Sequence, residues 1–164
     1  MLSKFTITLI GILLLLSFTP IQTVLAQQQI SEEKAIAERT LLLINNYRQS
    51  KGLAPLVSLP AIYEECLAHC RKMAEEKQVN HDNFDQRVKN VCKEIRCGGG
   101  SAENVAYNYE EADPAMRAFN QWRKSSGHHK NMLGKEYTHT GLAVVRGKEG
   151  AYYFTQLFIQ VSKR

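Results

Sequence analysis

Apolar side chains recur every three or four positions in three stretches of the chain, which is the spacing of one helix face. These stretches cover residues 31–50, residues 60 to about 77, and residues 112–124. Ser31 is expected to cap the first helix, and Gly52 is expected to stop it. The proline that opens the second stretch suits the first turn of a helix. The pattern therefore predicts three helices.

The end of the chain has a different pattern. Residues 140–145 and 152–161 are rich in β-branched and aromatic side chains, and a glycine-containing segment, 147–150, separates them. This arrangement predicts an antiparallel hairpin. Residues 84–88 are expected to form a short turn of helix, and residues 91–102, which include three consecutive glycines, a loop. Helices followed by strands predict an α+β domain with helices packed on a mainly antiparallel sheet.

The first 26 residues have the pattern of a secretory signal peptide. Lys4 supplies a positive charge, residues 6–18 are almost entirely apolar, and Val24-Leu25-Ala26 suits the cleavage position. The apolar run of about 13 residues is shorter than the roughly 20 that a bilayer-spanning helix needs, so no permanent membrane span is expected. A retained membrane anchor is the alternative. We therefore expect a secreted or periplasmic protein.

Composition supports one domain after the signal peptide. The chain has 164 residues, of which 44% are hydrophobic and 23% are charged, and these are values typical of a globular protein. The formal net charge is +5, but the basic residues are scattered. Because a nucleic acid requires a clustered basic stripe, we expect no nucleic-acid partner. The predicted division is a signal peptide (1–26), a tail with the start of the first helix (27–40), and one domain (41–164).

The four cysteines are Cys66, Cys70, Cys92 and Cys97. In an exported protein an even number of cysteines indicates disulfides. Cys66 and Cys70 lie four positions apart on one helix face, with Cβ atoms about 5–6 Å apart, whereas a disulfide prefers about 3.8 Å. We therefore expect at least one of them to pair with Cys92 or Cys97. The alternative is a local Cys92–Cys97 bridge that leaves two buried thiols.

Three segments combine polar side chains that can bind ligands or take part in catalysis. They are Asn80-His81-Asp82-Asn83-Phe84, with Arg87 close behind, then residues 100–106, which contain Glu103-Asn104-Val105-Ala106, and residues 122–133, which contain Ser125-Ser126-Gly127-His128-His129. Each segment alone is a weak signal, because a histidine beside an aspartate is usually a surface or capping residue.

In this order the segments resemble the CAP superfamily, which includes cysteine-rich secretory proteins, insect antigens and plant pathogenesis-related proteins. The bacterial SCP-like branch is the most similar. The resemblance also includes Ile44-Asn45-Asn46-Tyr47-Arg48, Gly141-Leu142-Ala143-Val144 and residues 153–158, and it covers roughly residues 41–161. It implies a three-layer α-β-α sandwich with an open cleft lined by two histidines and two acidic residues.

Residue by residue, the resemblance assigns the cleft to His81, Glu103 and His128, while Ser125 stands where the second acidic residue is expected. It implies a binding or interaction protein whose ligand is a small molecule, a lipid or a protein. His81 and His128 are the candidate ligands of zinc or another divalent cation. One alternative is a metal-assisted or serine-type hydrolase in which a histidine oriented by Glu103 activates Ser125 or a water. Another is a structural role, in which the histidines tie loops to the sheet.

We predict that signal peptidase cleaves the chain after Ala26. The reason is the combination of a charged start, a short apolar core and permissive residues at the cleavage position. Intact-mass measurement of the exported protein tests this prediction. A mature protein that begins at Met1 would contradict it.

Overall fold

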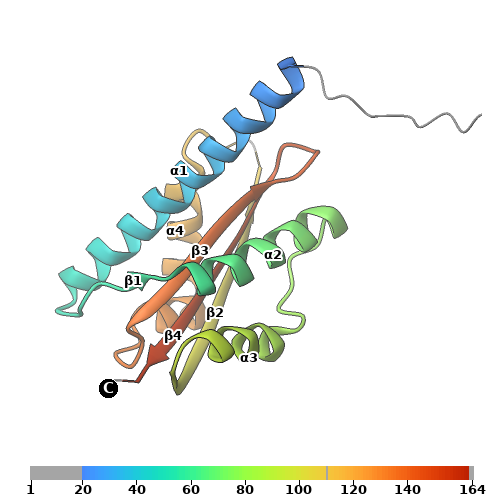
Figure 1. The fold of residues 1–164 in the computed structure, drawn as a ribbon. Helices are drawn as coiled ribbons and strands as arrows, with labels where there is room; N and C mark the ends of the chain where they lie inside the picture. The colour runs from blue at the N-terminus through green and yellow to red at the C-terminus, as the bar shows by residue number, and fades with distance from the viewer. Residues whose placement is uncertain (1–19, 110, 163–164) are drawn as a thin grey trace, which may run out of the picture.

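The computed structural model describes residues 20–109 and 111–162, so the apolar core of the predicted signal peptide lies outside the described residues. Figure 1 shows the arrangement of the helices and strands. In chain order they are α1 (Pro20–Ser50), β1 (Val57–Ser58), α2 (Pro60–Glu76), α3 (Phe84–Glu94), β2 (Cys97–Asn108), α4 (Pro114–Lys124), α5 (Ser126–Met132), β3 (His139–Arg146) and β4 (Tyr152–Val161).

The strands form one mixed sheet in the order β1-β3-β4-β2. The long strands β2, β4 and β3 are antiparallel to their neighbours, which confirms the predicted hairpin and the mainly antiparallel sheet. The short strand β1 is the exception, because it pairs in parallel with the start of β3, through Val57 with His139 and Ser58 with Thr140.

Helices cover both faces of this sheet, which confirms the α-β-α sandwich. In Figure 1, α1 and α4 lie on one side of the strands, and α2 and α3 lie on the other. Strand β4 is buried on both faces: Phe154 and Phe158 belong to the core under α1 and α4, whereas Tyr153 and Leu157 belong to the core under α2. Because side chains alternate along a strand, one central strand supplies both cores.

Three sequence predictions about element boundaries are wrong. Helix α1 already begins at Pro20, so Ser31 lies inside the helix instead of capping it. Helix α3 extends to Glu94, well beyond the short turn expected at residues 84–88. The expected glycine loop is the start of β2, where the register with β4 shifts between Cys97 and Ser101. The Gln160 side chain accepts a hydrogen bond from the Gly100 N–H at 3.2 Å, which holds this irregular strand end.

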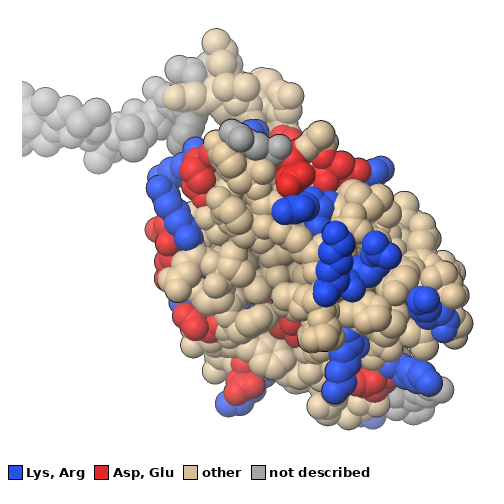
Figure 2. Space-filling view, turned by 180° about the vertical axis from the view of Figure 1, so that it is seen from behind, with Lys and Arg blue, Asp and Glu red and all other residues tan. Residues whose placement is uncertain are grey.

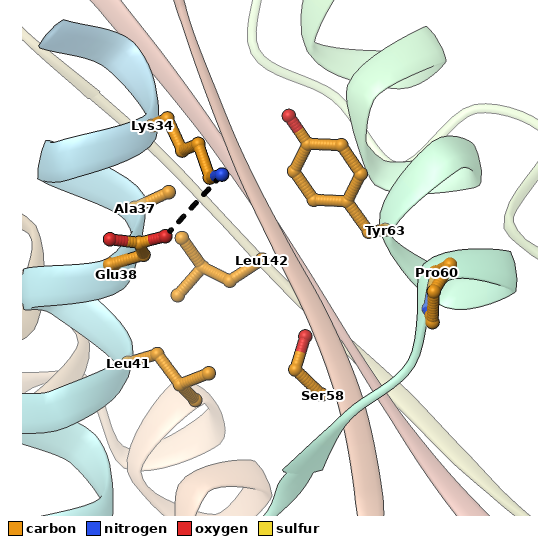
Figure 3. A pocket seen from close by; sticks show the side chains of 8 residues that line it. All are labelled: Lys34, Ala37, Glu38, Leu41, Ser58, Pro60, Tyr63 and Leu142. Carbon is orange, nitrogen blue, oxygen red and sulfur yellow. Dashed lines mark ion pairs between the residues drawn. The ribbon is translucent and has the colours of Figure 1, made fainter. Parts of the chain in front are cut away.

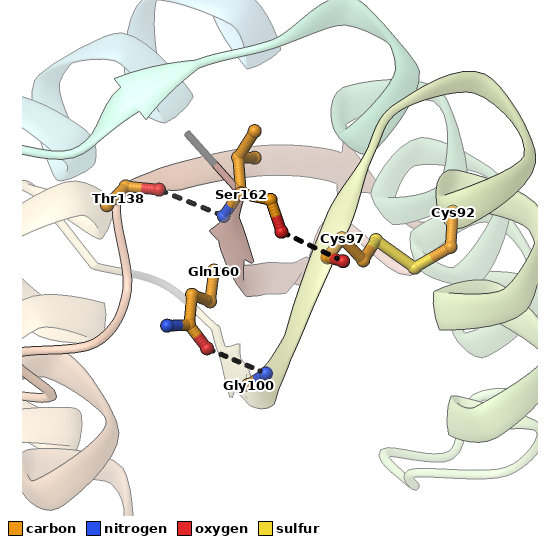
Figure 4. Close-up of a disulfide and its surroundings, with 7 residues drawn as sticks. Cys92, Cys97, Gly100, Thr138, Gln160 and Ser162 are labelled. Atoms are coloured by element: carbon orange, nitrogen blue, oxygen red, sulfur yellow. Dashed lines mark hydrogen bonds between the residues drawn. A yellow bond between two sulfur atoms is a disulfide. The ribbon is translucent and has the colours of Figure 1, made fainter. Parts of the chain in front are cut away.

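The disulfide joins Cys92 at the end of α3 to Cys97 at the start of β2 (Figure 4), with 5.4 Å between the Cα atoms. The local bridge is therefore confirmed, and the preferred pairing with Cys66 or Cys70 is wrong. The reason lies in the helix face that α2 turns to the sheet. The Cys66 and Cys70 thiols donate hydrogen bonds to the carbonyl groups of residues 141 and 143 in β3, at 3.2 and 3.3 Å. Burial raises the pKa of both thiols, that of Cys70 to about 12.

Arg48 holds the end of α1 to the segment that follows α5. Its guanidinium is buried and donates hydrogen bonds to four backbone carbonyl groups, those of Ala54, Met132, Gly134 and Tyr137. Burial lowers the pKa of Arg48. Because a buried cation needs all its donors satisfied, Arg48 fixes the position of α5, which carries one of the candidate site residues.

Gly141 allows α2 to approach the sheet closely. A Cβ atom at this position would overlap the backbone of α2 at the Ile62 carbonyl carbon and the Tyr63 nitrogen. Backbone atoms cannot move aside as the end of a flexible side chain can. The contact between α2 and β3 therefore depends on a residue without a side chain.

We predict that Gly141→Ala lowers the free energy of unfolding by about 1–3 kcal/mol, the usual cost of overpacking a core. Gly127→Ala in α5 is the matched control, because the added Cβ there meets no atom within 4 Å other than those of its chain neighbours and its own helix backbone. We expect the control to be neutral or slightly stabilising, since alanine favours a helix. Urea unfolding with the disulfide intact measures both variants, and equal changes would contradict the prediction.

Candidate functional site

The structure places His81 beside Glu103. Glu103 lies in β2 with its side chain only 2% exposed, whereas His81 lies in the loop before α3 with its side chain 52% exposed. The distance between His81 Nδ1 and Glu103 Oε1 is 2.8 Å. A buried carboxylate therefore holds one edge of an imidazole whose remaining edge reaches the surface.

Arg87 from α3 neutralises this carboxylate. Its Nε donates to Glu103 Oε2 at 2.9 Å, and its Nη2 lies 2.8 and 2.6 Å from the two carboxylate oxygens. Because an ionised carboxylate only accepts hydrogen bonds, His81 Nδ1 must carry a hydrogen. The neutral His81 ring then keeps its lone pair on Nε2, which is the nitrogen that remains free for a ligand.

His128 lies close to His81, although the two residues are far apart in the sequence. Their ring centroids are 6.5 Å apart, and the rings are inclined by 45°. Two asparagines hold His128 and helix α5 against β2. Asn104 donates a hydrogen bond from its side chain to the His128 carbonyl at 3.1 Å, and Asn131 donates to Asn104 Oδ1 at 3.0 Å and to the Glu103 carbonyl at 3.2 Å.

The environment of His128 favours its neutral form. Burial lowers the pKa of His128, and the positive charge that the neighbouring His81 can carry lowers it further. His69, which is buried, also has a pKa lowered by burial, and its Nε2 lies 2.9 Å from the Asn80 carbonyl. His69 therefore fixes the start of the loop that carries His81.

Ser125 lies apart from this network of side-chain contacts. It precedes α5, its N–H donates to the Gln121 carbonyl at 3.2 Å, and its own carbonyl accepts from the His129 N–H at 2.8 Å. Among the described residues, no imidazole forms a hydrogen bond with the Ser125 hydroxyl. The His129 ring instead lies 3.0 Å from the Tyr47 hydroxyl, measured from Nε2.

The donor set around His81 and His128 limits the metal chemistry. Within residues 20–109 and 111–162, no group of three or more His, Cys, Asp or Glu side chains is arranged to hold a metal ion. Both oxygens of Glu103 already accept hydrogen bonds from Arg87. A divalent cation at this position would therefore have two imidazole ligands and complete its coordination with water.

The roles of Arg87 and Asn131 were not predicted from the sequence. Arg87 falls on the apolar stripe of α3, and Val91 is a buried member of that stripe. A charged side chain at a core position of an amphipathic helix indicates a buried partner, so this signal was available. Asn131 carried no comparable signal, because its contacts to Glu103 and Asn104 depend on how α5 packs against β2.

Comparison with known proteins identifies the family. The model of the CAP family, described as the cysteine-rich secretory protein family, matches residues 41–158. The chain belongs to the CAP family. Among curated proteins, an uncharacterized membrane protein of Bacillus subtilis, YlbC, is 31% identical over 137 residues, which are 80% of this chain and 35% of YlbC. The CAP chain thus spans about a third of that relative's length.

Solved structures show the same fold. An extracellular SCP-domain protein from Bacillus anthracis matches with a TM-score of 0.68 and 22% identity, over 88% of this chain and 44% of that one. NaASP2, solved with Zn²⁺, matches with a TM-score of 0.56 and 15% identity, over 79% of this chain and 80% of that one. At these identities the likeness shows the CAP fold alone.

The surface of the CAP domain carries charges of both signs. Figure 2 shows Lys and Arg side chains spread over the rear face, with Asp and Glu side chains among them. In the part of the chain that the structure describes, no helix is both long enough and apolar enough to cross a membrane.

We predict that Glu103→Gln lowers the free energy of unfolding by about 3–5 kcal/mol, because it leaves the charge of Arg87 buried without a counter-ion. The exposed pair of Arg117 and Glu111, with 3.1 Å between Nε and Oε1, provides the control. Glu111→Gln should cost at most about 1 kcal/mol. Chemical denaturation of both variants measures the difference.

The double variant Arg87→Met with Glu103→Leu separates charge from packing. It removes both charges, so we expect it to be more stable than Glu103→Gln alone. A Glu103→Gln variant as stable as Glu111→Gln would contradict the account of a buried ion pair.

Proposed function

We propose that this CAP-domain protein is exported and binds a divalent cation, with zinc as the first candidate, between His81 and His128. The observation that carries the proposal is the pairing of two imidazoles with ring centroids 6.5 Å apart, one of which has a defined free nitrogen. The protein acts in this proposal as a binding or interaction protein, and the cation would fix the local surface on which a small-molecule, lipid or protein ligand docks.

The chemistry of the two side chains supports cation binding. Zinc binds neutral imidazole nitrogens with bonds of about 2 Å. Glu103 holds the hydrogen of His81 on Nδ1, and burial favours the neutral form of His128. NaASP2, a structural relative solved with Zn²⁺, adds support from the same fold. With only two protein ligands, the expected affinity is modest.

The same geometry favours binding over a hydrolase that uses Ser125 as nucleophile or Glu103 as a free base. A serine-type mechanism needs a base on the nucleophile, and no described imidazole forms a hydrogen bond with the hydroxyl of Ser125. A mechanism with a free carboxylate as general base needs an unpaired acid, whereas Glu103 is paired with the buried Arg87. Neither route has its required contact among these residues.

Export is part of the proposal. Residues 1–26 have the composition of a signal peptide, and the disulfide between Cys92 and Cys97 suits an oxidising compartment. The Bacillus anthracis protein with the same fold is an extracellular protein. We therefore propose a secreted or periplasmic protein whose residues 41–164 form the CAP domain.

We predict that zinc binds the exported protein and that His81→Ala or His128→Ala abolishes this binding. Isothermal titration of zinc measures it, and circular dichroism checks that each variant is folded. His129→Ala is the matched control, because His129 neighbours His128 in α5 but contacts Tyr47. The control should bind zinc as the wild type does. Unchanged affinity in the His81 and His128 double variant would contradict the proposal.

We also predict that the zinc affinity falls as the pH is lowered from about 6.5, the ordinary histidine pKa, towards about 5. Zinc and protons compete for the same lone pairs, so protonated imidazoles must lose a proton before they bind. Because the pKa of His128 is lowered, protons compete with zinc for this residue only at a lower pH than they would for an ordinary histidine. The same titration at several pH values measures this, and an affinity that is constant or rises in acid would contradict it.

A further inference from the structure

The outer edge of β3 is covered by β1 over only two residues, Val57 and Ser58. The Leu59 N–H donates to the Thr140 carbonyl at 3.0 Å, so the backbone groups of Thr140 point towards this edge. Backbone direction alternates along a strand that pairs on both sides. The backbone groups of Leu142, Val144 and Arg146 therefore point the same way, beyond the end of β1.

At the far end of this edge, side chains from α1 form hydrogen bonds with the outward backbone groups of β3. The Arg146 N–H donates to Glu33 Oε1 at 2.7 Å, and Gln29 Nε2 donates to the Arg146 carbonyl at 3.3 Å. Between the two ends, no described residue pairs with the outward N–H and carbonyl groups of Leu142 and Val144. These residues are only 4% and 3% exposed, and unpaired backbone groups with so little access to water are costly.

A groove of about 520 Å³ lies over this part of the edge (Figure 3). Leu142 lies at its floor, between α1 on one side and α2 on the other. Helix α1 contributes Ala37, Leu41 and the ion pair of Lys34 with Glu38 at 3.9 Å, whereas Ser58, Pro60 and Tyr63 form the opposite wall. The volume is in the range of ligand sites, about 300–1,000 Å³.

We propose that this groove binds an extended peptide, which adds a strand to the free edge of β3 beyond β1. A peptide backbone supplies alternating donors and acceptors that match the unpaired groups of Leu142 and Val144. Apolar side chains at alternate positions of the peptide would pack on Leu41 and Tyr63. A lipid tail would cover the same apolar wall but leave the backbone groups unpaired, so the peptide is the better match.

A phage-displayed library of random peptides, selected on the exported protein, tests this proposal. The enriched peptides are expected to have apolar residues at alternate positions and to slow amide hydrogen exchange at Leu142 and Val144. Ser58→Trp places a large side chain in the groove and should weaken binding about tenfold or more, as should N-methylation of alternate peptide amides. Val57→Trp, on the opposite face of β1, should leave binding within about twofold.

Glu38→Trp on the rim of α1 provides a second blocking variant if Ser58→Trp does not fold. The proposal is overturned if no peptide is enriched, or if the peptides bind both blocking variants as tightly as they bind Val57→Trp. Oleate that protects the Leu142 and Val144 amides while no peptide does so would overturn it in favour of a lipid site.

Discussion

The carboxylate of Glu103 is buried in β2, and an ionised group in that position is stable only with charged or hydrogen-bonding partners. Arg87 supplies the counter-charge from α3, and His81 supplies a further contact from the preceding loop. The backbone of the same residue accepts from Asn131 in α5. One buried acid therefore joins two helices and a loop to the sheet, and the orientation of His81 follows from that structural requirement.

The helices and strands that could be predicted from the sequence are those marked by a side-chain pattern within their own segment. The helix that begins at Pro60 and the hairpin of β3 and β4 follow from side-chain periodicity within each segment. The glycine-rich start of β2 could not be predicted in this way, because its strand pairing is held by Gln160 in a distant part of the chain. The cysteine pairing also depends on long-range packing. Cys66 and Cys70 face β3 and remain free thiols, so Cys92 pairs with the nearby Cys97.

The candidate site, too, could be predicted from the sequence only in part. His81, Glu103 and His128 came from the order of motifs, whereas the tautomer of His81 depends on Arg87, whose side chain reaches the carboxylate only after α3 packs against β2. The groove between α1 and α2 was not predictable at all. It exists because β1 is two residues long and because Gly141 lets α2 lie close to β3. The two surfaces that we propose as binding sites thus lie on one sheet, one beside β2 and one at the edge of β3.

The central claim is that Glu103 fixes the hydrogen of His81 on Nδ1 and leaves Nε2 free beside His128. Two-dimensional NMR of the histidine ring nitrogens, recorded with and without zinc, tests it most directly. The account predicts a protonated Nδ1 and an unprotonated Nε2 for His81, with zinc shifting a ring nitrogen of both His81 and His128. A protonated His81 Nε2 in the neutral ring, or zinc shifts confined to other histidines, would contradict it.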